Sequence, residues 1–256
     1  MKANRVKQLL KEGKPTCGSW VSLCSPVGAE VMGQLGFDWL LIDMEHSPLD
    51  YATLLSQMQA IDRGDTVPFV RVPWNDGATI KRVLDLGALG IMVPGVQTVE
   101  HTRHAVAACK YPPEGFRGVA SVRAARYGQD GTYLKEANGQ VMVVLQIETR
   151  EAVEDIDRIL DVPGIDCAFI GPADLSATLG HLGNAQHPDV QKAIAKIEAA
   201  ANKRKIALGS VSTSWEVAKG LIDKGYRIVS VMSDIRFMMA AASGAVDSFA
   251  KATGRA

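Results

Sequence analysis

The stretch QVMVVLQIETREAVEDIDRILD, residues 140–161, contains the unit from which the chain is built. Its first part, QVMVVLQIE (140–148), is an apolar and β-branched run of strand length. The segment EAVEDIDRILD (151–161) has apolar residues at helical spacing. Thr149 stands where an N-cap belongs, and Glu151 lies in the first turn. The stretch therefore predicts a strand that leads into an amphipathic helix.

The same alternation recurs along the whole chain. Strand-like runs occupy 17–23, 38–44, 68–72, 90–96, 140–148, 166–171, 205–211 and 227–233, with helix-like segments such as TVEHTRHAVAACK (98–110) between them. Alternating strands and helices favour parallel βαβ units, and eight units in about 250 residues predict a (β/α)8 TIM barrel. A doubly wound sheet is the alternative, but the segment CSPVGAE after the first strand lacks its GxGxxG turn. No linker is visible, so we expect one barrel domain over 1–256.

Composition narrows the class of protein. Hydrophobic residues make up 47% and charged residues 22%, as in ordinary globular proteins. The 28 basic residues equal the 28 acidic ones, which gives no reason to expect nucleic acid or an anionic membrane as a partner. The four cysteines form no CxxC pair, and the N-terminus has no apolar run of signal-peptide length. We therefore expect a reduced, cytoplasmic protein.

Polar residues gather where the predicted strands end. The ends of five strands carry such residues: Asp43, Glu45 and His46; Arg71; Gln146 and Glu148; Gly171, Pro172, Ala173 and Asp174; Ser233 and Asp234. In a barrel the carboxyl ends of all strands meet at one mouth. The sequence therefore predicts one shared site.

Each of these residues also has a structural interpretation. Glu148 could begin a helix and Asp174 could cap one, because acids favour helix N-termini. Arg71 lies within an apolar strand, where a buried guanidinium needs an anionic partner. His46 follows Asp43 by three residues, so a carboxylate that orients the imidazole as a general base is plausible.

The acids at the strand ends suit a hard divalent cation. Glu148 and Asp174 come without a His₃ or Cys cluster, and Mg²⁺ and Mn²⁺ prefer carboxylate and water oxygens. The motifs HExxH, GxSxG and the P-loop are absent. No lysine ends a predicted strand, as a Schiff-base aldolase would need.

The other histidines lie outside this group. His101 and His104 are predicted to lie on a solvated face of an outer helix. His181 and His187 fall in a loop, and we interpret them as surface residues, although His181 follows the Asp174 segment closely enough to rim the site.

Six motifs together are recognisable: DMEHSPLD, FVRVPWND, GALGIMVPGVQT, YPPEGFRGVA, LQIETREAVEDIDRIL and FIGPADLSATLG. In this combination the chain, from about residue 4 to 250, resembles the HpcH/HpaI family of metal-dependent class II pyruvate aldolases. That family includes 4-hydroxy-2-oxoheptanedioate aldolase and 2-keto-3-deoxy sugar-acid aldolases. The resemblance implies a (β/α)8 barrel that assembles as a hexamer with exchanged C-terminal helices.

The resemblance also implies roles for individual residues. Glu148 and Asp174 would bind the divalent cation, Mg²⁺ or Mn²⁺ or alternatively Co²⁺. Asp43 and His46 would form an acid–base dyad, and Arg71 would be the electrophilic and anchoring group. We expect the substrate to be bound by Gln146, Gly171, Pro172, Ala173, Asp174 and Glu45.

Two segments depart from the family pattern. Met44 stands where many relatives have glycine, and strand alternation predicts that its side chain packs against the outer helices. The second departure is GVASVRAARYG (118–128), in which Arg123, Arg126 and Tyr127 would tune the choice of acceptor. It lies within the irregular segment 110–131, which is expected to be a functional loop or an inter-subunit element.

The function that follows is reversible aldol cleavage of a 4-hydroxy-2-oxo acid to pyruvate, or a related 2-oxo acid, and an aldehyde. One alternative is a CoA-thioester lyase of the citrate lyase β or malyl-CoA lyase type. No Lys/Arg cluster for the CoA phosphates stands at a predicted strand end. The other alternative is a small-molecule-binding barrel without catalysis, which the complete set of a base, an orienting acid, an arginine and two metal ligands argues against.

Overall fold

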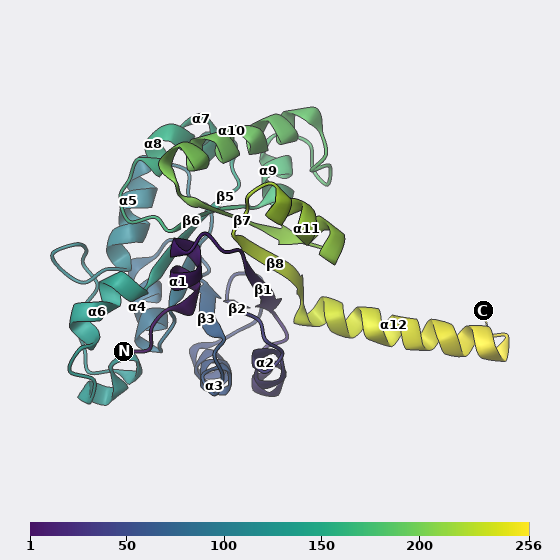
Figure 1. Ribbon diagram of the computed structural model, residues 1–256, viewed down its shortest axis with the longest axis horizontal. Coiled ribbons are helices and arrows are strands. Elements are labelled where there is room, and N and C mark those ends of the chain that lie inside the picture. Colours follow the sequence, from purple (N-terminus) through teal and green to yellow (C-terminus); the bar gives the residue numbers. More distant parts are fainter. Residues whose placement is uncertain (256) are drawn as a thin grey trace.

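Eight parallel strands close into a barrel in the computed structural model, which describes residues 1–255 (Figure 1). Each strand pairs with its sequence neighbours, and β8 closes the barrel against β1. The strands are β1 (Thr16–Val21), β2 (Trp39–Asp43), β3 (Val67–Arg71), β4 (Gly90–Val93), β5 (Met142–Ile147), β6 (Cys167–Ile170), β7 (Ala207–Ser212) and β8 (Ile228–Ser233). Every predicted strand is present, and the prediction of a (β/α)8 barrel is confirmed.

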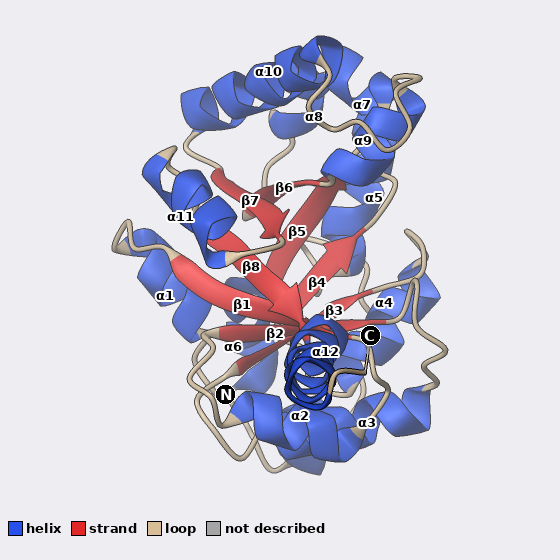
Figure 2. Ribbon diagram, turned by 90° about the vertical axis from the view of Figure 1, so that its right-hand side faces the viewer, coloured by secondary structure: helices blue, strands red, loops and turns tan. Residues whose placement is uncertain are grey.

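Helices surround the barrel, and most of them connect one strand to the next (Figure 2). They are α1 (Arg5–Lys11), α2 (Pro26–Gly33), α3 (Tyr51–Ile61), α4 (Gly77–Asp85), α5 (Val99–Ala108), the 3-10 helix η1 (Arg123–Gly128), α6 (Tyr133–Gln140), α7 (Arg150–Glu154), α8 (Ile156–Leu160), α9 (Pro172–Thr178), α10 (Pro188–Arg204), α11 (Trp215–Asp223) and α12 (Asp234–Thr253).

The strand–helix unit at 140–161 folds largely as predicted. Thr149 caps α7, because its hydroxyl oxygen accepts a hydrogen bond of 3.2 Å from the backbone N–H of Ala152. The predicted single helix over 151–161 is instead two short helices. Asp155 leaves the helical conformation, with φ −103° and ψ 19°, and thereby separates α7 from α8.

Alternation along the strands produces two cores. Trp39 and Leu41 of β2 belong to the inner core, while Leu40 and Ile42 belong to the core between the barrel and its helices. The inner core fills the barrel, and its contacts cross from one wall to the other, as in the edge-to-face contact of Trp20 on β1 with Phe169 on β6 at 6.3 Å between ring centroids. Met44 lies in the outer core, as predicted.

Helix α1 closes the amino-terminal end of the barrel. Val6 is fully buried in the inner core, and Leu10 packs beside it. The side-chain amide of Asn4 donates to the carbonyl oxygens of Leu89 and Gln140, at 2.9 and 2.8 Å. Because this end is plugged, an accessible site must lie at the opposite end, where the strands finish.

Helix α12 projects away from the barrel and contacts it only near its first turn (Figures 1 and 2). Its only buried residue is Asp234, so most of a rod roughly 30 Å long is exposed. That surface includes the large apolar side chains of Met238, Met239, Val246 and Phe249. None of the helices within residues 1–255 combines the length and the apolar character needed to cross a membrane.

Candidate active site

Asp43 and Arg71 form a buried ion pair at the mouth of the barrel. They are direct neighbours in the β2–β3 register, and both follow inner-core residues in the strand alternation. Arg71 Nε donates to Asp43 Oδ1 at 2.9 Å and Nη2 donates to Oδ2 at 2.7 Å. This two-bond geometry fixes the plane of the guanidinium. The anionic partner expected for a buried Arg71 is therefore Asp43.

Two further groups hold the Arg71 guanidinium. Its Cζ lies 4.4 Å from the centre of the Trp20 ring, within cation–π range. Its Nη1 lies 2.9 Å from Glu45 Oε2, which makes Glu45 a second anionic partner. Burial raises the pKa of Glu45, while the positive charge of Arg71 acts in the opposite direction. Arg71 thus has an acid on each side and an aromatic face against it.

His46 lies beyond the end of β2 with its side chain 67% exposed. Its Nε2 is 3.9 Å from Glu45 Oε2. Asp43 Oδ1 accepts the backbone N–H groups of Glu45 and His46, at 3.0 and 3.3 Å. The expected direct contact of Asp43 with the imidazole is not found among residues 1–255. The reason is register, since the Asp43 carboxylate points into the barrel at Arg71 while His46 leaves the strand.

Glu148 is a buried carboxylate on the other side of the mouth. The backbone N–H of Gly95 donates to its Oε1 at 2.9 Å, and the amide of Gln146 donates to its Oε2. Burial raises the pKa of Glu148, and the negative charges of Asp174 and Glu45 raise it further. Glu148 is therefore positioned by neutral donors and destabilised in its ionised form.

Asp174 lies in the first turn of α9, immediately after β6, and it is exposed. Its charge reaches both Glu148 and Glu45, since it raises the pKa of each. Within the part of the chain that the structure describes, no lysine or arginine forms an ion pair with Glu148 or Asp174. The mouth thus holds an acidic pair without a counter-charge of its own.

This acidic pair fits a hard divalent cation. Carboxylate oxygens are the donors such ions prefer, and a cation would offset the repulsion that raises the pKa of Glu148. The backbone also leaves room beside the carboxylate. A Cβ at Gly171 would lie 2.6 Å from Glu148 Oε2, so a larger residue there would occupy the space next to the carboxylate.

The mouth continues into a cavity of about 320 Å³ that the sequence did not predict. It is lined by Trp20, Ser22, Val211, Ser212, Thr213, Met232, Ser233 and Arg236. Trp20 also contacts Arg71, so this cavity adjoins the ion-pair network. The sequence signal that could have identified this cavity is the position of Trp20, which lies near the end of the first strand on its inward-facing side.

Asp234, at the end of the eighth predicted strand, has a structural role. Its carboxylate accepts the backbone N–H of Ser22 at 3.0 Å and that of Leu23 at 3.1 Å. These bonds connect the end of β1 to the start of α12. Asp234 therefore closes the barrel wall, although it was grouped with the polar strand ends.

Within one chain, the part of the segment 110–131 that carries Arg123, Arg126 and Tyr127 lies away from the mouth. Arg123 donates to the carbonyl oxygen of Leu86 at 2.5 Å and to Asp62 at 3.0 Å. Together with Arg126 and Tyr127 it lines a cavity of about 830 Å³ beside Pro68 and Leu89, where β3 and β4 begin. The expectation that these residues tune acceptor choice in their own chain is wrong, because all three lie at the amino-terminal end of the strands. The inter-subunit alternative stays a prediction.

Fold and site together define a barrel with a charged mouth that combines an arginine and an acidic pair. A family model described as HpcH/HpaI aldolase/citrate lyase matches residues 16–241. The chain belongs to this family, as predicted from its motifs.

Two curated relatives and one solved structure resemble nearly the whole chain. A 4-hydroxy-2-oxo-heptane-1,7-dioate aldolase from Klebsiella pneumoniae is 46% identical over 233 residues, which make up 90% of this chain and 88% of the relative. A hydroxypyruvate/pyruvate aldolase from Paraburkholderia phytofirmans is 42% identical over 93% of this chain and 94% of the relative. The crystal structure of a family protein from Burkholderia cenocepacia matches with a TM-score of 0.93 and 40% identity, covering 96% of this chain and 99% of that one. Aldolases, which are carbon–carbon lyases, are therefore the enzymes that this chain resembles.

Proposed function

We propose that this protein catalyses the reversible aldol cleavage of a 4-hydroxy-2-oxo acid to pyruvate, or a related 2-oxo acid, and an aldehyde. The observation that carries the proposal is the placement of an acidic pair, Glu148 and Asp174, at the same mouth as a fixed guanidinium, Arg71. A 2-oxo acid has two adjacent oxygens for a cation, and its keto oxygen develops negative charge during cleavage that an arginine can stabilise. The names of the relatives support the same reaction class.

Glu148 and Asp174 would hold a divalent cation, Mg²⁺ or Mn²⁺ or alternatively Co²⁺. When bound, such an ion supplies Lewis-acid stabilisation of negative charge on the keto oxygen of the substrate. Gln146 orients Glu148 through its amide, and Gly171 leaves the space beside the carboxylate open.

Arg71 would supply positive charge at the same oxygen from the opposite side. Because Asp43 and Glu45 hold three of its nitrogens, the guanidinium does not have to be reoriented when charge develops. The carboxylate of the substrate would be received at the start of α9. There Pro172 occupies the first turn, and the amides of Ala173 and Asp174 have no partner within the helix.

His46 would accept the proton of the C4 hydroxyl group during cleavage and return it during addition. Its exposed ring lies beside Glu45 and is accessible to an incoming substrate. Glu45 would then stand between the base and Arg71, close enough to orient the ring by a small movement.

Assembly is part of the proposal. The apolar side chains of α12 lie on a helix that leaves its own barrel, so a second copy of the chain is the occupant we propose for them. A hexamer of single-domain, cytoplasmic chains (1–256 each) is consistent with this arrangement.

Pyruvate release tests the proposal. The chelator-treated protein would be incubated with a 4-hydroxy-2-oxo acid, with and without Mg²⁺ or Mn²⁺, and pyruvate would be measured by a coupled assay. Metal-dependent release supports the proposal. Activity confined to a CoA thioester would favour the lyase alternative, and no turnover of either substrate would favour a binding barrel.

A further inference from the structure

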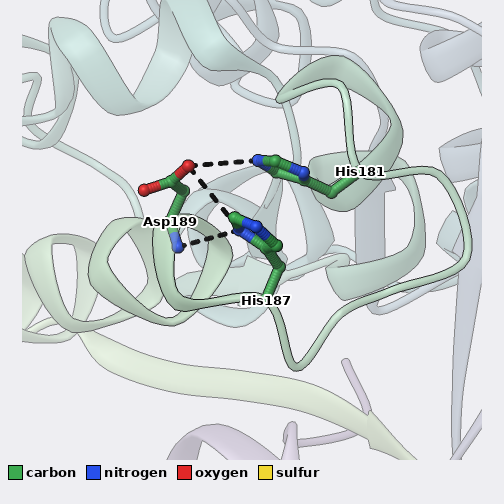
Figure 3. A group of neighbouring side chains, drawn as sticks. All are labelled: His181, His187 and Asp189. Atoms are coloured by element: carbon green, nitrogen blue, oxygen red, sulfur yellow. Dashed lines mark hydrogen bonds and ion pairs between the residues drawn. The ribbon is translucent and has the colours of Figure 1, made fainter.

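Two histidines at the end of the loop between α9 and α10 converge with an aspartate in the first turn of α10 (Figure 3). His181 Nε2 lies 3.1 Å from Asp189 Oδ2, and His187 Nδ1 lies 3.6 Å from the same oxygen. The two imidazole rings stack with centroids 3.4 Å apart and planes 15° apart. Among residues 1–255 this is the only group of three histidine, cysteine or acidic side chains whose ligand atoms all lie within 4.8 Å of one another.

We propose that His181, His187 and Asp189 form a solvent-facing metal site, separate from the acidic pair at the mouth, that binds a borderline divalent cation such as Zn²⁺. The bound ion would fasten the α9–α10 loop to the start of α10. Two imidazole nitrogens and one carboxylate oxygen are donors that Zn²⁺ accepts, and the fourth position would be open to water.

The spacing of the ligand atoms fits a tetrahedral ion. Metal–ligand bonds of roughly 2.0–2.1 Å place the ligand atoms of a tetrahedral zinc site roughly 3.3 Å apart. The observed separations of 3.1 and 3.6 Å lie on either side of that value. Because imidazole lone pairs lie in the ring planes, the two nearly parallel rings would have to rotate about their side-chain bonds so that both nitrogens face one ion.

The backbone that carries these ligands is already held in place. The N–H of His181 donates to the carbonyl oxygen of Ser176 at 2.7 Å, and two turn bonds connect His181 to Asn184 and Asn184 to His187. Pro188 occupies the first turn of α10 and fixes the direction of the chain between His187 and Asp189. The ordering cost of metal binding is then confined to the side chains.

Two features oppose the ion and limit its affinity. His187 Nδ1 also accepts the backbone N–H of Asp189 at 3.2 Å, so this N-cap bond competes with metal ligation. The amino-terminal end of α10 carries a partial positive charge, which disfavours a cation. The negative charge of Asp189 offsets the second effect, and we expect a dissociation constant on the order of micromolar rather than nanomolar.

The ligand atoms distinguish this site from the acidic pair at the mouth. Glu148 and Asp174 offer oxygens only and would favour Mg²⁺ or Mn²⁺, whereas the imidazoles favour Zn²⁺. The cluster can therefore be tested without the acidic pair. In the double variant Glu148→Gln and Asp174→Asn, Zn²⁺ binding would be measured by isothermal titration calorimetry on the chelator-treated, full-length protein.

We expect this double variant to bind one Zn²⁺ per chain. Adding His181→Ala should weaken binding at least about tenfold, because loss of a direct ligand should exceed the effect of losing an outer partner. His181 is the informative position, since its ring takes no part in the helix cap. His101→Ala, which removes an imidazole from α5, is the matched control and should leave binding unchanged.

Cobalt substitution provides an independent measurement. Co²⁺ should give the visible absorption of a tetrahedral ion in the double variant and in the His101→Ala control, and that absorption should be lost with His181→Ala. Equal Zn²⁺ affinity with and without His181 would overturn the proposal. Absence of Zn²⁺ binding in the double variant would also overturn it, and neither result would affect the proposed catalytic metal.

Discussion

The two sides of the barrel mouth differ in how their charges are balanced. On the β2–β3 side, Arg71 is held by Asp43 and Glu45 and is stacked on Trp20. On the β5–β6 side, burial and the charge of Asp174 raise the pKa of Glu148, and neither acid has a cationic partner in residues 1–255. The β2–β3 side therefore has a cation between its two acids, whereas the β5–β6 side has two acids and no cation.

The difference indicates which side changes during function. A buried cation that is held by two acids resists rearrangement, because moving it away leaves uncompensated charges. An acidic pair without a counter-ion is unfavourable in the folded protein until a cation binds. We infer that the β2–β3 side presents a preformed group and the β5–β6 side recruits one.

The largest expected effect is on the β5–β6 side, which has no cation of its own. Asp174→Asn should lower aldol cleavage by at least about 10⁴-fold, because Lewis-acid stabilisation of developing charge contributes several kcal/mol. Cleavage rates and Mg²⁺ binding would be measured on the same preparations. Full activity of the wild-type protein after exhaustive chelation would contradict the division of roles between the two sides.

Replacing His46 tests whether the general base lies outside both the β2–β3 side and the β5–β6 side of the mouth. His46→Ala should lower cleavage by roughly 10²–10⁴-fold, the usual contribution of a general base. Exchange of the pyruvate methyl protons and pyruvate affinity should persist, because Arg71 and the acidic pair remain. If cleavage were normal in this variant, Glu45 would become the candidate base.

A smaller effect, the coupling energy in a double-mutant cycle, distinguishes Arg71 from His46 as the partner of Asp43. Residues in contact show coupling of about 0.5–3 kcal/mol, so Asp43→Asn and Arg71→Lys together should be little worse than the poorer single variant. Arg71→Lys alone keeps the charge but loses the planar fork, and it should slow all acceptors about equally.

The control cycle combines Asp43→Asn with His46→Ala. These losses should add, because the Asp43 carboxylate contacts the backbone of His46 and not its ring. If the losses were additive for Asp43 with Arg71 but coupled for Asp43 with His46, the acid–base dyad of Asp43 and His46 that the sequence predicted would be supported instead.

The barrel could be predicted because its signals are local. Each strand is a short apolar run, and each helix shows its own periodicity. The partner of Asp43 could not be predicted in the same way. His46 is three positions from Asp43 in the sequence, but Asp43 contacts Arg71, which is the direct neighbour of Asp43 in the β2–β3 register. Register depends on how whole strands pair.

Two other features also depended on tertiary structure. The segment with Arg123 shows no sequence signal that selects one end of the barrel, and only its contacts with Leu86 and Asp62 place it. The cluster of His181, His187 and Asp189 forms because the loop turns back on the start of α10. Each histidine alone has the sequence context of an ordinary surface residue.

The smallest expected effect concerns stability and again separates the two sides. Burial and neighbouring acids raise the pKa of Glu148 above its ordinary value. A carboxyl group with a raised pKa binds more protons in the folded state than in the unfolded state between the two values. Its cost to stability is therefore absent below the unfolded pKa, grows as pH rises through the folded pKa, and is complete above it.

Glu148→Gln should remove that cost while preserving the contacts. The new amide oxygen can accept from Gly95. The new NH₂ group replaces Oε2, which accepts from the Gln146 amide, so the Gln146 amide must flip to present Oε1, a buried oxygen that has no hydrogen-bond partner in the wild type. In chelator at neutral pH we expect the melting temperature to rise by about 2–4 °C, the shift that roughly 1 kcal/mol produces in a chain of this size.

A pH series, a Mg²⁺ titration and a control variant test the stability predicted for Glu148→Gln. The difference between Glu148→Gln and the wild type should shrink as pH falls toward the ordinary range of a glutamate, because protonation removes the same charge. Saturating Mg²⁺ should reverse the order of the two proteins, since only the wild type gains stability from binding. Asp43→Asn should lower the melting temperature in chelator, because it leaves the buried Arg71 with one anionic partner. If Glu148→Gln melted below the wild type in chelator, the β5–β6 side would be as well balanced as the β2–β3 side, and the inferred need for a cation would lose its physical basis.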